Sequence, residues 1–415
     1  MCKNLNFLFL LIAFFITSCR IDDSKEQELF VHEKTEWTYA LYMAADNNLE
    51  RFALKNIKEI KENLGTKKIN FIVLLDRANG YDKTEGNWTD TKILELQANT
   101  EINGDIIIEL GEKDTSDIST LNEFLDFTSR YYPSEKFALN IWSHGFGVFP
   151  DCKIPKDSRS VIQDYTTGYS EDSSISIIEL SNALNRFCKN QNKKIEILQF
   201  DCCLMQMIEI LWQLKDCADF IIGSQTELPG SGSNYSTLYK NLTSSLNTEN
   251  CASSIIENFY EKYKNTLVSC AYSAVNMNKF ESFTNTFNIF FDKIKNDTKT
   301  DFSLIKKHRE NLYNYDSNLI EYTDLKSFLY TFETENYEAE TKAALQELIK
   351  DYNEIITKSF TNNLYSEKKL SGIGINIPYT EKLYSYYNQN SENYLDIYNS
   401  TCLSFIIKKI AQSEI

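Results

Sequence analysis

The sequence predicts an α/β fold, with a mainly parallel central sheet between two layers of helices. Short apolar runs rich in β-branched and aromatic residues alternate with segments of helical periodicity along most of the chain. Most of these runs are apolar throughout, as in strands that helices cover on both faces, and such strands are typical of parallel sheets. Of the 415 residues, 42% are apolar and only five are proline, which suits a large, well-packed domain.

In the first third of the chain, two apolar runs predict buried strands, and the polar residues between them predict the start of a helix. Asparagine directly before a periodic segment is a common N-cap, and shorter, more polar runs predict a hairpin near the surface. The expected order is strand Trp37–Met43, a helix capped by Asn47 or Asn48 that ends near Asn63, strand Ile69–Leu75, short strands Trp88–Leu96 and Ile106–Leu110, and helix Ser116–Tyr131 capped by Thr115 or Ser116.

In the middle of the chain, two predicted strands each end abruptly in a reactive residue. The strand Phe137–Trp142 runs into His144 and Gly145, and the strand Ile195–Phe200 runs into Asp201, Cys202 and Cys203. A polar stretch (residues 153–174) and a helix over Ser176–Lys189 lie between them. Since the run that begins at Leu204 has helical spacing, we expect a helix directly after Cys203.

The last part of the chain predicts further strands and several long helices. The expected elements are strands Phe220–Ser224 and Ser269–Val275, helices Lys279–Lys295, Leu304–Leu312 and Ala339–Lys358, strand Gly372–Pro378 and a closing helix. No internal repeat or linker divides residues 36–415, so we expect one domain with C-terminal helical additions.

The N-terminus is typical of a bacterial lipoprotein. Lys3 precedes an apolar stretch of about a dozen residues, too short to span a bilayer, and small residues then precede Cys19. We therefore expect residues 1–18 to be a signal peptide, Cys19 to be lipidated, and residues 19–35 to be a tether. The alternative is an ordinary secretory signal in which Cys19 is incidental. Either reading places the mature chain in the cell envelope or outside the cell, and membrane contact would come only through the lipid.

Charge and cysteine content narrow the possible partners. The formal net charge is −16, which argues against nucleic acid as a partner and mildly favours cationic substrates. Apart from Cys2 and Cys19, the cysteines are scattered without metal-ligand spacing. The sequence is compatible with disulfides between these cysteines and with buried free thiols.

The two reactive strand ends suggest a nucleophile and its base. Open α/β sheets place their chemistry beyond the carboxyl ends of the strands. The chain holds only three histidines, and His144 is the one that sits at a strand end among apolar residues. A thiol and an imidazole at two such ends favour covalent catalysis by Cys203 with His144.

Five ordered blocks resemble the clostripain family of cysteine peptidases, in the caspase-like clan. They are Tyr39–Leu49, Asn140–Gly145, Phe200–Met205, Gly223–Tyr235 and Ser371–Pro378. The resemblance implies a caspase-like α/β/α sandwich and an endopeptidase that uses His144 and Cys203. It also implies that the backbone amides of Gly145 and Cys203 hold the oxyanion. The N-terminus of the helix expected after Cys203 would favour the thiolate form of that residue.

The resemblance further assigns Asp201 to the S1 pocket, where it would pair with a P1 Arg or Lys. A carboxylate suits a guanidinium fork better than an ammonium, so Arg is expected over Lys. The alternative is that Asp201 caps the following helix. Gln225, Thr226 and Glu227 are expected to line the groove.

The sequence departs from the family pattern at three places. Cys202 replaces a small residue, which permits a vicinal disulfide with Cys203, and the usual aromatic residue near Ser233 is absent. Members of the family can require cleavage in the loop after the histidine, where Lys153, Lys156 and Arg159 supply basic sites. An ordinary polar loop would also contain such residues.

The expected chemistry requires no cofactor; Ca²⁺ is the cofactor that the resemblance implies, although the sequence does not say where it would bind. Acidic residues surround the loop after His144, but none has EF-hand spacing, and solvated carboxylates are the default. These residues are Asp151, Asp157, Asp164, Glu171 and Asp172. Asp46 ends the first strand, where it could position the site or cap the first helix with Asn47, and the cap is the expected role.

Three other functions compete with the Arg-directed peptidase. The first is a catalytically silent lipoprotein that binds peptides or glycans, and the second is a peptidase with another P1 preference. Asp201 argues against cleavage after Asp, which needs a basic pocket. The third is a metal hydrolase, for which one well-placed histidine is too few.

Overall fold

The structure of the chain is a computed structural model. The structure describes residues 30–148, 161–162, 164–166, 174–244, 247–315, 322–333, 337–381, 384 and 395–414. The signal peptide, Cys19 and the basic residues Lys153, Lys156 and Arg159 lie outside the described residues. Among the described helices, none is long and apolar enough to cross a membrane.

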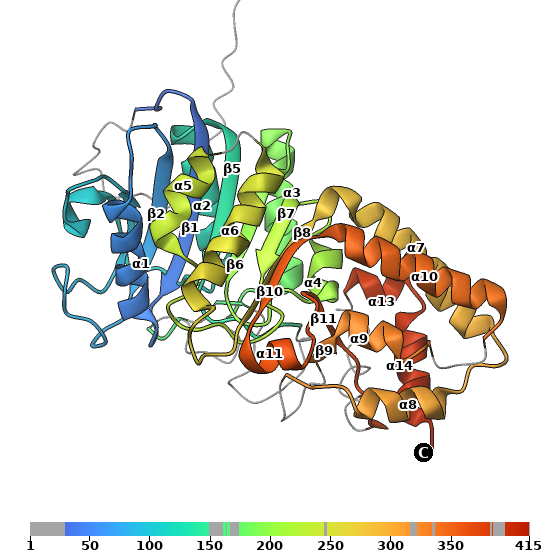
Figure 1. Cartoon of the computed structure of the whole chain (residues 1–415). Coiled ribbons are helices and arrows are strands. Elements are labelled where there is room, and N and C mark those ends of the chain that lie inside the picture. Colours follow the sequence, from blue (N-terminus) through green and yellow to red (C-terminus); the bar gives the residue numbers. More distant parts are fainter. Residues whose placement is uncertain are drawn as a thin grey trace, which may run out of the picture.

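A nine-stranded sheet forms the centre of the molecule (Figure 1). Its strands are β1 (Thr35–Ala45), β2 (Asn70–Arg77), β3 (Thr91–Glu95), β4 (Ile106–Gly111), β5 (Ser134–Trp142), β6 (Ile195–Asp201), β7 (Ala218–Gly223), β8 (Ala271–Asn276) and β10 (Ile356–Thr361). Their order in the sheet is β10-β8-β7-β6-β5-β1-β2-β3-β4. The five central strands, in the order β7-β6-β5-β1-β2, pair in parallel. Strands β3, β4, β8 and β10, toward the two ends of the sheet, pair antiparallel. The predicted α/β class and the mainly parallel centre are therefore confirmed.

Helices cover both faces of the sheet and enclose two hydrophobic cores. One core packs α1 (Glu50–Glu62), α5 (Leu238–Thr243) and α6 (Thr248–Tyr263) against the sheet. The other packs α2 (Ile118–Tyr131), α3 (Ile177–Gln191) and α4 (Ile208–Gln213) against the opposite face. Residues therefore alternate between the two cores along β1, and the sandwich architecture follows.

The C-terminal part adds helices beyond the sheet end that carries β8 and β10 (Figure 1). These are α7 (Phe280–Asn296), α8 (Phe302–Glu310), α9 (Leu325–Tyr330), α10 (Ala339–Ile355), α11 (Asn363–Glu367), α13 (Asp396–Ser400) and α14 (Leu403–Gln412). A small sheet of β9 (Tyr322–Asp324) and β11 (Gly374–Asn376) returns toward the main sheet, where the Gly374 N–H donates to the Gln206 carbonyl at 2.9 Å. Short 3₁₀ turns complete the list: η1 (Ile102–Asp105), η2 (Tyr235–Thr237) and η3 (Met277–Lys279).

Some local predictions were wrong, and one helix was missed. The helix after Cys203 begins at Ile208 rather than Leu204, because the Leu204 and Gln206 N–H groups instead donate to the carbonyls of Thr226 and Ser224. The expected helix to Lys358 ends at Ile355, where β10 follows directly. Helix α2 is capped by the Asp117 side chain rather than by Thr115 or Ser116. Helix α6 was not predicted at all.

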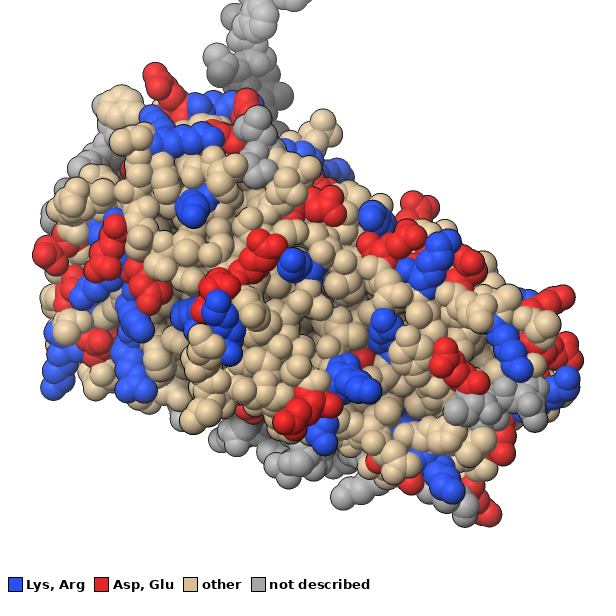
Figure 2. All heavy atoms as spheres, viewed as in Figure 1, with Lys and Arg blue, Asp and Glu red and all other residues tan. Residues whose placement is uncertain are grey.

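The surface charges are mixed. Figure 2 shows basic and acidic side chains interspersed over the face that carries α5, α6 and α10, without a continuous patch of one sign. Some of the described salt bridges are exposed pairs, such as Lys358–Glu257 at 2.9 Å, and these contribute little to stability. The net negative charge is therefore not concentrated on this face.

Candidate active site

The two reactive strand ends lie side by side. Strands β5 and β6 are neighbours, with Trp142 opposite Asp201, so His144 and Cys203 each follow two residues later at the same edge of the sheet. A Cβ atom placed on Gly145 would lie 2.3 Å from the Cys203 carbonyl oxygen and 3.0 Å from the Cys203 nitrogen. Only glycine fits at this contact, and it brings the two loops together.

An asparagine from a third strand end orients the histidine. His144 Nε2 lies 2.7 Å from Asn48 Oδ1, so an N–H at Nε2 would donate to the amide oxygen. Asn47, rather than Asp46, serves the turn before α1, since its Oδ1 accepts from the Leu49 N–H. Burial lowers the pKa of His144, which favours the neutral imidazole. Sequence reasoning considered Asn48 only as a helix cap; the pair of asparagines after β1 was the available signal.

Residues within the polar stretch also bond to the backbone beside His144. The Ile162 N–H donates to the His144 carbonyl at 3.1 Å, and Val161 bridges both Gly145 and Ile175. In this pairing the Gly145 N–H is not part of the ladder with Val161.

The surroundings of Cys203 favour the neutral, protonated thiol. Its Sγ accepts from the Leu228 N–H at 3.2 Å, and burial raises its pKa to about 11, with the nearby carboxylates Glu227 and Asp201 adding to the rise. The expected support from a helix N-terminus is wrong, because α4 starts five residues later. The thiol is therefore protonated at neutral pH in this conformation.

The adjacent cysteine points elsewhere. Cys202 is buried in the core under α3 and α4, and its Sγ donates to the Ile141 carbonyl at 3.2 Å. Burial raises the pKa of Cys202 well above its usual value. Both thiols are free. These surroundings favour Cys203, the less buried of the two, as the reactive thiol.

Asp201 is bound inside the protein. Its Oδ2 accepts from the Tyr235 hydroxyl at 2.6 Å and from the Ser233 N–H at 3.0 Å, and the residue is 6% exposed. Burial raises its pKa, while these two donors oppose the rise. Gly232 has φ +56° and a Cβ there would lie 2.3 Å from Asp201 Oδ2, so glycine lets this turn close over the carboxylate. The alternative role as a helix cap is excluded, because no helix begins within six residues of Asp201.

The segment from Gln225 to Ser233, which we call the covering segment, lies over the thiol and Asp201. Helix α6 holds it: Lys262 Nζ donates to the carbonyls of Ser231 and Ser233, each at 2.7 Å, and the Tyr263 hydroxyl donates to that of Gly232 at 2.8 Å. Sequence reasoning missed this clamp because it missed α6.

Two residues expected to line the groove differ in their surroundings. The prediction for Gln225 was wrong: it is 1% exposed, its Nε2 donates to Asp324 Oδ2 at 3.2 Å, and its Oε1 accepts from the Gly372 N–H. It joins β7 to the small sheet. Glu227 is exposed, and its charge contributes to the raised pKa of Cys203, so it does lie near the thiol.

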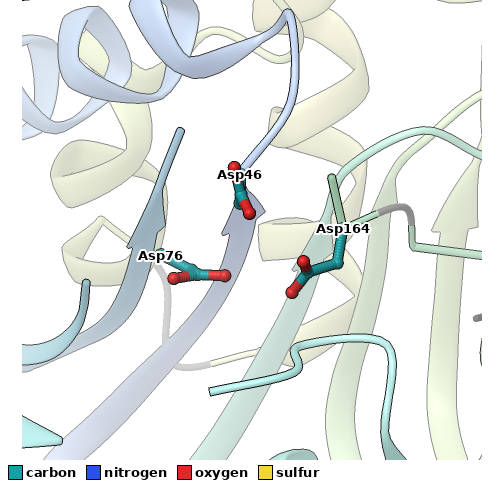
Figure 3. Close-up of side chains that lie close together, drawn as sticks. All are labelled: Asp46, Asp76 and Asp164. Carbon is teal, nitrogen blue, oxygen red and sulfur yellow. The ribbon is translucent and has the colours of Figure 1, made fainter. Parts of the chain in front are cut away.

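Three carboxylates converge at the ends of β1 and β2 (Figure 3). Asp46, Asp76 and Asp164 are all buried, and each offers an oxygen within 4.8 Å of the others. The expectation that Asp164 is solvated was therefore wrong. Asp46 also does not cap α1; its Oδ2 accepts from the Thr166 N–H at 2.7 Å.

Comparisons with known proteins agree on one family. The model of the clostripain family matches residues 41–408. Clostripain of Hathewaya histolytica is 25% identical over 233 residues, which cover 51% of this chain and 43% of that protein. The match thus spans less than half the length of this curated relative.

Solved structures share the fold. A secreted C11 cysteine protease from Bacteroides thetaiotaomicron, in complex with an irreversible peptide inhibitor, is 20% identical with a TM-score of 0.64, over 87% of this chain and 98% of that one. An inactive zymogen C11 protease from Parabacteroides distasonis is 19% identical with a TM-score of 0.64, over 92% of this chain and 100% of that one. The caspase-like architecture is therefore confirmed.

Proposed function

The chain belongs to the clostripain family of cysteine peptidases, and from this premise we propose that it is an endopeptidase that cleaves after basic residues, Arg over Lys, with Cys203 and His144. The observation that carries the proposal is the contact of Gly145 with the Cys203 backbone. It sets the imidazole-bearing loop against the thiol-bearing loop at adjacent strand ends. Neither residue alone would support an enzyme.

The proposed chemistry assigns one task to each group. His144 takes the proton of Cys203, and the thiolate attacks the scissile carbonyl carbon. The N–H groups of Gly145 and Cys203 stabilise the oxyanion, where loss of one donor typically costs about 3–4 kcal/mol. The imidazolium of His144 then protonates the leaving amine, and water hydrolyses the thioester with His144 as base.

The proposed P1 preference depends on Asp201, supported by exposed Glu227. Asp201 is a carboxylate in a buried, low-dielectric position, where pairing with a guanidinium is strong. Because Ser233 and Tyr235 already donate to it and Gly232 closes over it, a P1 side chain can reach it only when the covering segment moves. The same movement would release Cys203 Sγ from Leu228. Glu227 would attract the incoming cation at the surface.

We further propose how the protein is processed and placed. Signal removal and lipidation at Cys19 would anchor it in the cell envelope, and cleavage after Lys153, Lys156 or Arg159 would precede activity. A cut there would leave the described segment from Val161 bonded to His144 but free at its N-terminal end.

Fluorogenic peptides with P1 Arg, Lys or Asp test the proposal. The soluble form without residues 1–19 would be assayed with and without reductant, beside Cys203→Ala and Cys202→Ala. Cleavage after Arg that is lost only in Cys203→Ala supports it, and Asp201→Asn should then raise KM for the Arg peptide far more than it lowers kcat. Cleavage that survives in Cys203→Ala would contradict the proposed nucleophile.

A silent peptide-binding scaffold is the second candidate. The thiol pKa of about 11 favours it, since a neutral thiol is a poor nucleophile. Absence of turnover after the 153–159 stretch has been cut with an added protease, while the protein remains folded and binds the Arg peptide, would support this candidate.

A further inference from the structure

A chain of hydrogen-bonded polar side chains lies in the core beneath Asp201, on the sheet face that α6 covers. It consists of Tyr39, Asn140, Gln199, Tyr235 and Tyr272, and each is at most 1% exposed. Asn140 and Gln199 lie opposite each other on the neighbouring strands β5 and β6. Polar groups in an apolar core are costly unless they bond to one another, so this chain requires an explanation.

The hydrogen bonds at the Asp201 end of the chain run in one direction. An ionised carboxylate can only accept hydrogen bonds, so the Tyr235 hydroxyl gives its one proton to Asp201 Oδ2, at 2.6 Å. This length lies within the range of about 2.5–2.7 Å for a hydroxyl bonded to a charged carboxylate. The oxygen of the same hydroxyl then accepts from Asn140 Nδ2 at 3.0 Å. Asn140 therefore turns its amide nitrogen, and not its oxygen, toward Tyr235.

A second tyrosine holds the Asn140 amide in this orientation. Asn140 Nδ2 also donates to the Tyr39 hydroxyl at 3.0 Å, and that hydroxyl gives its own proton to Gln199 Oε1 at 2.9 Å. Asn140 Oδ1 is buried and has no hydrogen-bond partner among the described residues. Buried polar atoms are nearly always satisfied, and an amide placed only to stabilise the core would bond through both of its ends. The two tyrosines, and not the acceptor of the amide itself, thus decide how Asn140 lies.

The two donors to Asp201 Oδ2 differ in how firmly they are attached. The Ser233 N–H belongs to the covering segment, which has to move before a P1 side chain can reach Asp201. Tyr235 lies beyond that segment in η2, and its ring packs in the core with α6. Asn140 ties its hydroxyl to β5. Tyr235 is therefore the donor that can stay bonded to Asp201 while the covering segment opens.

We propose that Tyr235, held by Asn140, is a positioning residue for P1 recognition: it keeps the buried Asp201 carboxylate charged and fixed in orientation when a basic side chain enters. This inference rests on the proposed function, because it requires Asp201 to bind the P1 cation. A charged carboxylate pairs strongly with a guanidinium, whereas a protonated one offers it no charge. Among the described residues, neither Tyr235 nor Asn140 hydrogen-bonds to His144 or Cys203, so their effect should fall on KM.

The electrostatics around Asp201 agree with this geometry. Burial raises the pKa of Asp201, and the bond from the Tyr235 hydroxyl is the strongest of the influences that lower it again. The charge of Lys262 on α6 also lowers this pKa, and that of Glu59 on α1 raises it. Other titratable groups near Asp201 stay neutral near pH 7, because burial raises their pKa values: Tyr39, Cys202, Cys203, Tyr263 and Tyr272. Loss of the Tyr235 hydroxyl should therefore raise the pKa of Asp201, so that its charge is lost at a higher pH.

The test compares Tyr235→Phe with the wild-type enzyme, each in its soluble, processed form. Phenylalanine keeps the ring and removes only the hydroxyl. For a P1-Arg peptide we expect KM to rise about tenfold near pH 7 with a smaller change in kcat. As the solution is acidified, KM should begin to rise at a higher pH than in the wild type. Tyr352→Phe is the matched control and should change neither KM nor its pH dependence, since Tyr352 is equally buried and its hydroxyl bonds to Ser371 Oγ at 2.6 Å.

Asn140→Leu shows whether the two residues act together. Leucine is similar in size but donates no hydrogen bond, so KM for the Arg peptide should rise, and the double variant with Tyr235→Phe should be no worse than Tyr235→Phe alone. Multiplied effects in the double variant would contradict the role of Asn140. Unchanged KM and pH dependence in Tyr235→Phe, beside a wild type that cleaves the Arg peptide, would overturn this inference alone. Absence of Arg cleavage by the wild type would overturn the proposed function, and this inference with it.

Discussion

At the scale of single residues, Gly145 and Cys203 show how closely the site depends on backbone contact. Strand ends can be predicted from where apolar runs stop. The placement of His144 and Cys203 at one edge of the sheet could therefore be predicted from the apolar runs alone. The roles of Asn48 and Leu228 could not, since both act on the site through folded loops. Burial of Gln225 was also invisible, because polar residues at strand ends are usually exposed.

Replacing Gly145 with alanine should nearly abolish activity and weaken the fold. The new Cβ would overlap the Cys203 carbonyl oxygen and force the two loops apart. We expect the free energy of unfolding to fall by about 1–3 kcal/mol and kcat/KM to fall by about 100-fold or more. Urea unfolding and peptide cleavage measure the two effects.

Gly104→Ala is the control for this change. A Cβ on Gly104 meets nothing closer than 3.7 Å, so both quantities should stay near wild type. Full activity in Gly145→Ala would show that the two loops are not held at their described separation during catalysis.

At the scale of elements, helix α6 holds the substrate side of the site through the covering segment. Its last turn carries Lys262, whose pKa burial lowers and which donates to backbone carbonyls of the covering segment. The same segment presents the Ser233 N–H to Asp201. The helix thus determines the position of a carboxylate that it does not contact through a hydrogen bond.

Lys262→Met should disturb substrate binding more than chemistry. The methionine keeps the apolar stem but removes charge-assisted bonds to the carbonyls, so we expect a loss of about 2 kcal/mol in unfolding free energy. The KM for a P1-Arg peptide should rise several-fold with a smaller change in kcat. Lys264→Met, at an exposed position two residues later, is the control and should change neither constant. A fall in kcat at unchanged KM would contradict a positioning role through Asp201.

The element after Cys203 shows why periodicity alone misleads. Leu204 to Leu211 has helical spacing, yet the N–H groups of Leu204 and Gln206 donate to the carbonyls of Thr226 and Ser224, and Leu204 takes φ +60°. The tertiary partner that wins here is the segment directly after β7. The spacing of apolar residues predicts which residues are buried. It does not predict which backbone groups their own N–H and C=O groups will bond to.

At the scale of the whole molecule, Glu209 links α4 to the C-terminal additions. Its Oε1 accepts from the Asn376 N–H at 2.9 Å and from the Tyr398 hydroxyl at 3.0 Å, and complete burial raises its pKa to about 7. Because the folded protein holds this proton more tightly than the unfolded chain does, the carboxyl favours folding most below about pH 4.5. That contribution is lost as pH rises through about 7.

Glu209→Gln should therefore stabilise the protein only at higher pH. Glutamine stays neutral and keeps an acceptor oxygen, so at pH 8 we expect a gain of up to about 3 kcal/mol in unfolding free energy, and near pH 5 a much smaller one. Denaturant unfolding at the two pH values measures this. Equal effects at both values would show that Glu209 does not titrate as inferred.

A cut between residues 153 and 159 should leave the two pieces associated. The first piece holds β1 to β5 and the second holds β6 to β11, and the parallel pair β5–β6 joins them in the middle of the sheet between two buried cores. After cleavage at an engineered site, one species should elute on gel filtration in native buffer and two bands should run under denaturing conditions. Two separate native peaks would contradict this description of the sheet.

The adjacency of β5 and β6 also sets an order in time as the chain is made. Strand β5 can pair with β1 as soon as it is complete, but its other edge, mostly apolar and buried from Phe137 to Trp142, waits for the long crossover and for β6. Unpaired apolar edges recruit other chains, and long-range parallel pairs form slowly. The interval between the two pairings is therefore when the nascent chain is most exposed to aggregation.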